Sequence, residues 1–460
     1  MDRRRFKAGV LVAALLGLGA CATYAPRELP GGADVAPNSE RLTADLSKLR
    51  LAPLQGHRFD PSDGLDPTEA AILAVLNNPD LMAKRAQAGV AAAQAFSAGL
   101  LPDPQVTYSL DIPANPVGST SAYNATPSLD LMTLVTHSAA LKAAQASARQ
   151  ADLDLLWSEW NTAQQARQLA VSALANEEKA GVLKALADRL ADRYARSRAA
   201  LEHADVSAAV AGADLAAKLD AEAALATAEH DAAKARGDLN ALLGLAPAAR
   251  LNLVPGDPVT DPDSAALDAA LAALPERRPD LLALRAGYGA QDANLRKAII
   301  AQFPILNLGF SHARDTSDVV TNGVSATFVV PIFNRGRGEI AVQSATREQL
   351  RAEYQARLDQ TVADEAAARR ERETARALIS RLQAQVPTLL ATASQAEGPY
   401  RRGDIDSAAY LAIQQAALNH EVALLDQRLA FELAGIGLET VLFLPSDHPS
   451  DLPSSVGAKP

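Results

Sequence analysis

The sequence predicts a fold that is mainly α-helical with a small β part, built as long antiparallel helical hairpins that carry four short strands. The first observation is an internal two-fold repeat. Asn78-Pro79-Asp80-Leu81 and Arg278-Pro279-Asp280-Leu281 each precede two short alternating stretches and then a long Ala-rich stretch. The second is composition: only 4% of the 460 residues are aromatic and the chain has 1 cysteine, which fits extended helical packing better than several compact cores.

The repeat divides the chain into six segments. They are a signal peptide (1–21), an extended leader (22–65), a first repeat (66–244), a linker (245–263), a second repeat (264–444) and a disordered tail (445–460). Leader, linker and tail are rich in proline together with Gly, Ser or Asp, which is typical of segments without regular structure. Asp66 followed by Pro67 predicts a capped helix start, and Asn78-Pro79 predicts a break in that helix.

The N-terminus is typical of an exported lipoprotein. Arg3-Arg4-Arg5 precedes an apolar run from Ala8 to Leu18, which is shorter than the ~20 residues that cross a bilayer as a helix. The run ends in Leu18-Gly19-Ala20-Cys21, which resembles a bacterial lipobox. Because Cys21 is the only cysteine, no intrachain disulfide is expected, and we expect it to carry a lipid anchor that includes palmitate. The arginines also resemble a twin-arginine signal, so the export route stays open.

Charge and motifs argue against several function classes. With 44 basic and 54 acidic residues the chain offers no basic surface for nucleic acid. The 7 histidines are scattered, and Gly336-Arg337-Gly338 lacks the rest of any phosphate-binding loop. We therefore expect no enzyme activity, no cofactor and no metal site.

Strands are expected at about 104–112 and 127–135, and again at 305–313 and 322–331. In each pair apolar and polar side chains alternate, so one face of the strands is apolar. The residues expected to face lipid are Val106, Tyr108, Leu110, Leu306, Leu308, Phe310 and Phe328. One such hairpin alone fits a soluble sheet edge equally well. Two hairpins at equivalent places favour the wall of a membrane barrel.

Four strands cannot close a membrane barrel, because bacterial outer-membrane barrels need about 8 or more. Open edges in lipid would leave backbone groups without hydrogen bonds. The chain must therefore oligomerise if the strands lie in a membrane, either as a dimer or as a trimer.

Two helical hairpins are expected at about 137–243 and 338–443. The stretch 137–200 contains no proline, and at ~1.5 Å per residue it spans roughly 100 Å as one helix. Leu183, Leu186 and Leu190 supply an apolar stripe at helical spacing, which is typical of coiled-coil packing. Breaks near Asp205 and from Gly398 to Asp404 turn each hairpin.

Four motifs together resemble the TolC-like outer-membrane efflux proteins, within them the lipoprotein channels of resistance-nodulation-division pumps. They are the lipobox at Cys21, Leu76 to Leu81, Leu101-Pro102-Asp103-Pro104 and the stretch 330–340, and the resemblance spans about 66–444. In the last motif the chain must leave a strand and enter a helix in little space, which assigns the strand-to-helix turn to Pro331, Asn334, Gly336 and Gly338.

The resemblance implies a homotrimer with a twelve-stranded barrel in the outer membrane and a helical tunnel through the periplasm. It implies a passive duct whose helical tips dock on a periplasmic adaptor and whose energy comes from an inner-membrane pump. The tip residues are His203, Asp205, Val206, Arg402, Gly403, Asp404 and Ile405. No gate residue is assigned, because 381–396 contains no acidic residue.

Several alternatives remain open from the sequence. The cargo is a drug, a solvent or a heavy-metal cation. A lipid-anchored periplasmic spacer or adaptor without a channel is the competing structural interpretation. For Asp404 and Asp406, a solvated turn or a helix cap competes with an electrostatic role at the tip.

Overall fold

The computed structural model describes residues 24–114, 117–256, 263–303, 305–329 and 332–444, with backbone only at 305, 306 and 329. Cys21, Pro331 and the tail from 445 lie outside the described residues. The chain forms two units. In the first, residues 24–35 contain neither helix nor strand. The second unit begins at Ala36 and contains all of the helices and strands described.

The described part of the first repeat contains four long helices and two strands. The helices are α3 (Pro67–Asn77), α4 (Pro79–Gly99), α5 (Leu131–Glu202) and α6 (Ala208–Leu242). The predicted start of α3 is confirmed: the Asp66 carboxylate accepts hydrogen bonds from the Thr68 and Glu69 amides, which completes a capping box. The predicted break is confirmed as well, since Asn78 caps α4 with Pro79 at its first position.

The second repeat has the same plan. Its helices are α7 (Ser264–Arg277), α8 (Pro279–Ile300), α9 (Arg337–Gln395), α10 (Glu397–Arg402) and α11 (Ser407–Leu442). Arg278 takes the place of Asn78: its guanidinium pairs with Asp280 at 2.8 Å and donates to the Val441 carbonyl. The short helix α10 has no counterpart among the described helices of the first repeat.

The four strands form one antiparallel sheet in the order β1-β2-β3-β4. The strands are β1 (Gln105–Asp111), β2 (Ala122–Asp130), β3 (Ile305–Arg314) and β4 (Val320–Val329). The two repeats therefore join within the sheet through the β2–β3 pair, whose register runs from Tyr123 opposite Arg314 to Asp130 opposite Asn307. This ladder has a gap at Thr126 and Pro127, as expected for a residue without an N–H group.

The prediction of a return strand at 127–135 is wrong by five residues. The strand runs from Ala122 to Asp130, and α5 begins at Leu131. Asp130 explains the boundary, because its carboxylate accepts hydrogen bonds from the Met132 and Thr133 amides and so caps the helix. The strand predicted at 322–331 begins two residues earlier, at Val320, and its last two predicted positions lie outside the described residues.

The leader is extended only in part. From Ala36 onward it packs on the helices, with short turns at Ser39–Arg41 and Leu46–Lys48 and the helix α2 (Ala52–Gln55). Parallel bridges join Ala36 to Leu245 and Leu65 to Leu253. Leu51 and Leu54 are buried in the main core. The prediction of an extended leader, with at most a short helix near 41–49, missed these isolated leucines because they follow no helical or strand period.

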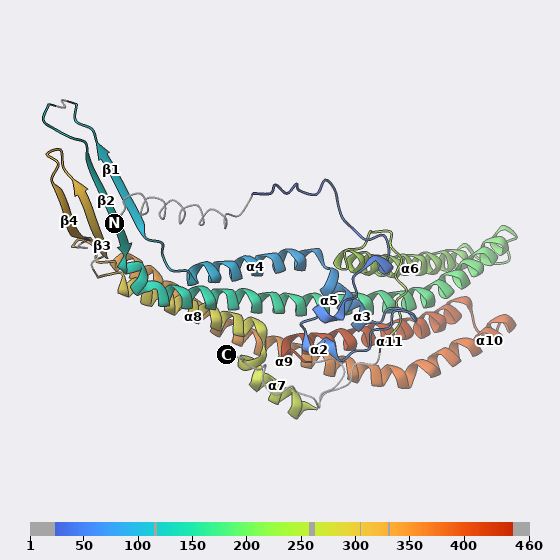
Figure 1. Cartoon of the computed structure of the whole chain (residues 1–460). Coiled ribbons are helices and arrows are strands. Elements are labelled where there is room, and N and C mark those ends of the chain that lie inside the picture. The colour runs from blue at the N-terminus through green and yellow to red at the C-terminus, as the bar shows by residue number, and fades with distance from the viewer. Residues whose placement is uncertain (1–23, 115–116, 257–262, 304, 330–331, 445–460) are drawn as a thin grey trace. The chain divides into compact units, whose positions relative to one another are not determined.

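Helix α5 is the centre of the packing, since α3, α4, α6, α8 and α11 all contact it. The main core lies where α3 meets the middle of α5, around the fully buried Trp160. Figure 1 shows the strands beyond one end of α4, α5 and α8, while the turns that end α5 and α10 lie at the opposite end. Among the described helices, none combines the length and the apolarity needed to cross a membrane.

Candidate functional site

The sheet has one apolar face and one polar face. Cross-strand partners of an antiparallel sheet share a face, so the register assigns each side chain. Val106 pairs with Pro127, Leu308 with both Leu129 and Ala326, and Phe310 with Val324. The apolar face thus carries Val106, Tyr108, Leu110, Leu129, Leu308, Phe310, Val324 and Phe328.

The apolar face is uncovered in the single chain. Tyr108 is 63% exposed, Val324 82% and Phe328 60%, and Val106, Leu110, Leu308 and Phe310 are exposed too. Leu306 pairs with Phe328 and so occupies this face by register, although its side chain lies outside the described residues. The predicted lipid-facing residues therefore share one face of the sheet. His312, Arg314 and Asn322 lie on the same face at the loop end of β3 and β4, so the apolar part covers the rest of the strands. An uncovered apolar surface of this kind marks a contact with lipid or with another protein.

The two helical tips have the same local geometry. In the first, Ala204 has a φ of 62° and the Asp205 amide donates to the Ala200 carbonyl at 2.8 Å. In the second, Gly403 has a φ of 80° and the Asp404 amide donates to the Pro399 carbonyl at 2.9 Å. Both helices end at a residue with left-handed backbone conformation. Glycine adopts this conformation without strain, whereas alanine does not.

The predicted tip residues lie in these turns. Val206 and Ile405 are half-buried, whereas His203 and Asp205 are exposed. Arg402 and Asp404 pair with each other at 2.9 Å on the surface. Asp406 is a helix cap, because its carboxylate accepts from the Ala409 amide at 2.7 Å. The predicted positions of the turns are confirmed, and the docking role of their residues stays a prediction.

A buried arginine joins the two hairpins next to the tips. Arg193 of α5 pairs with Asp214 of α6 at 2.8 Å, and both side chains are at least nine-tenths buried. Across the repeat boundary, the same guanidinium donates to the Ser407 hydroxyl at the start of α11. We call Arg193, Asp214, Ser407, Tyr400 and Tyr410 the tip clamp.

The two tyrosines of the tip clamp hold the arginine from the side of the second repeat. Tyr400 and Tyr410 stack with ring centroids 4.7 Å apart, and the Arg193 guanidinium lies 4.9 and 5.0 Å from them. Such cation–π contacts stabilise a desolvated arginine. Arg193 is therefore the point at which the second hairpin is attached to the first beside its tip.

Sequence reasoning did not find the tip clamp. The stretch 381–396 near the second tip contains no acidic residue, whereas the acid that pairs with Arg193 is Asp214 on the other hairpin. A usable indication existed: Asp214 interrupts an Ala-rich stretch at a position that becomes fully buried. Its partner follows only from the packing of α5 against α6 and α11.

The turn between β4 and α9 is tight. Arg335 and Gly336 both have left-handed backbone, with φ of 48° and 68°, and the Asn334 side chain accepts a hydrogen bond from the Gly336 amide at 3.0 Å. Asn334 and Gly336 thus serve the turn as predicted. Gly338 does not: it lies in the first turn of α9, where a side chain would meet open space.

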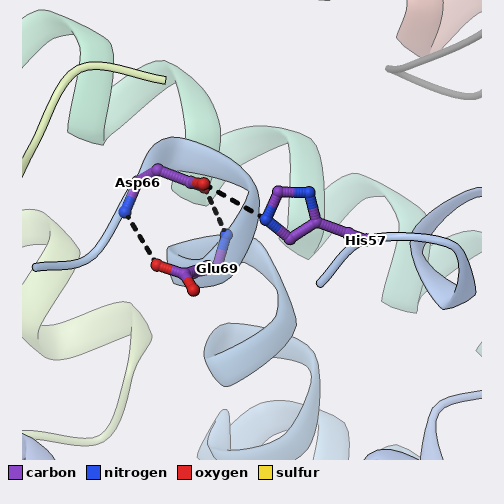
Figure 2. Close-up of side chains that lie close together, drawn as sticks. All are labelled: His57, Asp66 and Glu69. Carbon is purple, nitrogen blue, oxygen red and sulfur yellow. Dashed lines mark hydrogen bonds and ion pairs between the residues drawn. The ribbon is translucent and has the colours of Figure 1, made fainter. Parts of the chain in front are cut away.

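One cluster of possible metal ligands occurs in the described part of the chain: His57, Asp66 and Glu69 (Figure 2). His57 Nε2 lies 3.1 Å from Asp66 Oδ2. The other Asp66 oxygen accepts from two amides of α3, and the Glu69 oxygens accept from the Asp60 and Asp66 amides. Both carboxylates are therefore used to start α3, which makes a helix cap the better assignment.

Replacing Asp66 with alanine should lower the free energy of unfolding by about 1–2 kcal/mol, because two amides of α3 lose their acceptor. Asp66→Asn keeps an acceptor and should cost less. Thermal unfolding followed by circular dichroism in detergent measures both. If added zinc raises the melting temperature of the wild type but not of either variant, the cluster is a metal site instead.

Comparison with known proteins agrees with this geometry. Residues 270–442 match the family model described as outer membrane efflux protein. No curated protein matches the chain in sequence.

Solved structures of bacterial membrane proteins have the same fold. A membrane protein from Pseudomonas aeruginosa aligns over 92% of this chain and 99% of its own, with 18% identity and a TM-score of 0.70. The CmeC outer membrane channel of Campylobacter jejuni aligns over 93% and 96%, with 16% identity and a TM-score of 0.68. The VceC outer membrane protein of Vibrio cholerae aligns over 82% of this chain and 95% of its own, with 17% identity and a TM-score of 0.66. The chain therefore has the fold of these proteins, as the sequence motifs predicted.

Proposed function

We propose that this chain, whose residues 270–442 match the outer membrane efflux protein family model, is the outer-membrane channel of a tripartite efflux pump. It is a passive duct from the periplasm to the exterior, and the match of residues 270–442 to an efflux-protein family supports a channel rather than an enzyme. The observation that carries the proposal is the two-faced sheet, because a periplasmic spacer has no use for an uncovered apolar strand surface.

The proposed assembly is a homotrimer. Within one chain β1 and β4 are the edges of the sheet, and each offers unpaired backbone groups along one side. Pairing β4 of one copy with β1 of the next in three copies gives a closed barrel of twelve strands, with apolar faces toward lipid and polar faces toward water.

The helical hairpins would then cross the periplasm from the barrel to the tips. The tips that contain Asp205, Val206, Asp404 and Ile405 would dock on a periplasmic adaptor, which connects the channel to an inner-membrane pump. A lipid on Cys21 would anchor the chain to the outer membrane. In this arrangement the tip clamp holds the second hairpin against the first and keeps the periplasmic end narrow.

In this arrangement the inner-membrane pump, and not the duct, selects the cargo. A passive duct needs no site that binds cargo tightly, so drugs, solvents and metal cations all remain candidates. A deletion strain exposed to both hydrophobic drugs and heavy metals distinguishes them by which sensitivity rises.

Two measurements on the purified protein test the channel. The mass of the detergent-solubilised particle should equal three chains, and the particle should open conducting pores in a planar bilayer. A stable monomer, or a trimer that never conducts at any pH or salt concentration even when the tip clamp is broken, would support the lipid-anchored spacer instead.

A further inference from the structure

We propose that neighbouring copies of the chain meet in one defined strand register, in which Thr327 of β4 pairs with Thr107 of the partner subunit on β1. This inference rests on the proposed function, because it specifies how the copies of the proposed homotrimer join. It comes from the internal repeat, since the β2–β3 pair already joins the end of one hairpin to the start of the other within a single chain. In a ring of copies, β4 meets the next β1 in the same way.

Both edges of the sheet are suited to pairing with another strand. β4 contains neither a charged residue nor a proline, and the only charged residue of β1 is Asp111 at its end. Proteins usually protect exposed edges with charged side chains, proline or bulges. The one proline within the four strands, Pro127, lies instead in β2, inside the sheet. The two edges are therefore open to a strand of a second copy.

The repeat shows which positions of β1 and β3 are equivalent. Leu101-Pro102 precedes β1 as Phe303-Pro304 precedes β3. Each position of β1 therefore corresponds to the position of β3 that lies 202 residues later, which is the distance from Leu101 to Phe303. Thr107 corresponds in this way to Gly309.

The ladders then relate β2 to β4. Ser128 pairs with Gln105 of β1. Thr327 pairs with Asn307, which is the equivalent of Gln105 on β3. Ser128 of β2 is therefore equivalent to Thr327 of β4.

The junction inside the chain now predicts the junction between copies. Ser128 pairs with Gly309 where β2 meets β3. The equivalents of these two residues are Thr327 and Thr107. Where β4 meets the next β1, Thr327 therefore lies opposite Thr107 of the partner subunit.

The pairs that follow from this register match in character on both faces of the sheet. On the apolar face Phe328 lies opposite Val106 of the partner subunit, and Val324 lies opposite Leu110 of the partner subunit. All four side chains are more than half exposed in the single chain. On the polar face a threonine meets a threonine and a serine meets a serine, and matched cross-strand pairs stabilise a sheet. A shift by one residue would instead turn the apolar side chains of one edge toward the polar face of the other.

The register also gives a barrel of ordinary geometry. The ladder runs across the chain through Gln105, Ser128, Gly309 and Ser325. In the proposed register it continues to Ser109 of the partner subunit, so one passage across a chain moves it from position 105 to position 109. Three copies therefore displace it by about twelve residues, which at ~3.3 Å per residue and ~4.8 Å between twelve strands corresponds to a strand tilt of about 35°. Strands of membrane barrels are tilted by ~35–45°.

A second alignment of the repeats predicts a different register. Asn78-Pro79 and Arg278-Pro279 are 200 residues apart, and carrying that distance into the strands would place Phe328 opposite Leu110 of the partner subunit. The ladder would then move by about eight residues per chain and the strands would tilt by about 54°, which is steeper than membrane strands adopt. The barrel geometry thus selects the 202-residue alignment.

The chain beside each edge carries side chains that complement each other at the helix end of the sheet. Leu101 precedes β1 and is 68% exposed, and Phe333 follows β4 and is 87% exposed. Carried past the end of β4, the register brings Phe333 next to Leu101 of the partner subunit. Asp103 beside β1 and Arg335 beyond β4 add opposite charges to the two sides, and both are exposed in the single chain. A second copy therefore covers apolar surface here that one chain leaves open to water.

Disulfide trapping tests the register, because Cys21 is the only cysteine of the chain. The double variants Thr107→Cys with Thr327→Cys, and Val106→Cys with Phe328→Cys, place thiols at two successive pairs of the ladder. Such pairs alternate between wider and closer spacing, so one of the two has the closer spacing. Mild oxidation of the purified oligomer in detergent should shift its mobility on denaturing gels from one chain to three chains. Reduction should reverse the shift.

A disulfide within one chain does not explain such a shift. β1 and β4 of the same chain are three strand spacings or roughly 14 Å apart, whereas a disulfide joins Cα atoms that lie ~4.4–6.8 Å apart. Each single variant should run as one chain, which shows that two matched thiols are required.

Leu110→Cys with Phe328→Cys is the matched control, because these residues face each other only in the 200-residue alignment. In the proposed register they lie about 13 Å apart along the strands, so this variant should also run as one chain. Cross-linking in the control instead of the two test variants would overturn the register, and so would an intact trimer that neither test pair links. Both results leave the channel proposal standing. A purified particle with the mass of one chain would overturn the channel proposal, and the inference with it.

Discussion

Tyr108→Arg is expected to prevent assembly of the protein into the outer membrane, whereas Thr107→Arg is expected to be tolerated. The two residues are neighbours on β1, but Tyr108 pairs with Ala125 on the apolar face and Thr107 with Thr126 on the polar face. An arginine at the lipid surface near the bilayer midplane costs about 2–4 kcal/mol. Each chain of an oligomer would carry that cost. On the water-filled side the same side chain remains solvated.

Fractionation of outer membranes, followed by heat-modifiability of the oligomer on gels, measures this difference. Equal insertion of the two variants would mean that the apolar face does not meet lipid, and would return the chain to the spacer interpretation.

Arg193→Ala should loosen the periplasmic end of the duct. Removing the guanidinium leaves Asp214 buried without its cation, and breaking one partner of a buried pair costs about 3–5 kcal/mol. The contact with Ser407 and the stacking on Tyr400 and Tyr410 disappear with it. We expect the second hairpin to detach near its tip, which should raise the open probability of single channels in bilayers and sensitise cells to large antibiotics.

Lys179→Gln is the matched control for this prediction. Lys179 of α5 also pairs across the repeat boundary, with Asp426 of α11 at 2.8 Å, but the Asp426 side chain is 46% exposed. Exposed pairs contribute about 0–1 kcal/mol, so this variant should conduct like the wild type. Asp214→Asn should reproduce the Arg193→Ala phenotype in part. Wild-type open probability in Arg193→Ala, with the oligomer intact, would show that the tip clamp is structural only.

The parts of the fold that were predictable from sequence are those fixed by local chemistry. Asp66 with Pro67, Asn78 with Pro79, and the Gly403-Asp404 turn each dictate the backbone within a few residues, and the structure has a helix boundary at all three. The apolar face of the strands was predictable for the same reason, since a period of two is visible in a short stretch.

The parts of the fold that the sequence did not predict depend on contacts that a short stretch of sequence does not contain. The alternation of Leu129 and Leu131 looks like a strand, but Asp130 between them caps α5 and ends β2. The tip clamp unites residues from three helices of both repeats, so no window of sequence contains it. The leucines of the leader are buried only because α3 and α5 already provide a core beneath them.

The pairing of β2 with β3 also sets the order in which the protein can form. Tyr123 and Arg314 are partners although one whole repeat of the sequence separates them. The α5–α6 hairpin can form from local contacts, whereas the entropy of closing so long a loop delays this ladder. A chain translocated from its N-terminus must therefore expose β2 as an open edge until the second repeat has followed. The exposed edge of β2 must therefore be protected from pairing with other chains in the periplasm. This protection is needed during the interval between export of the first repeat and export of the second.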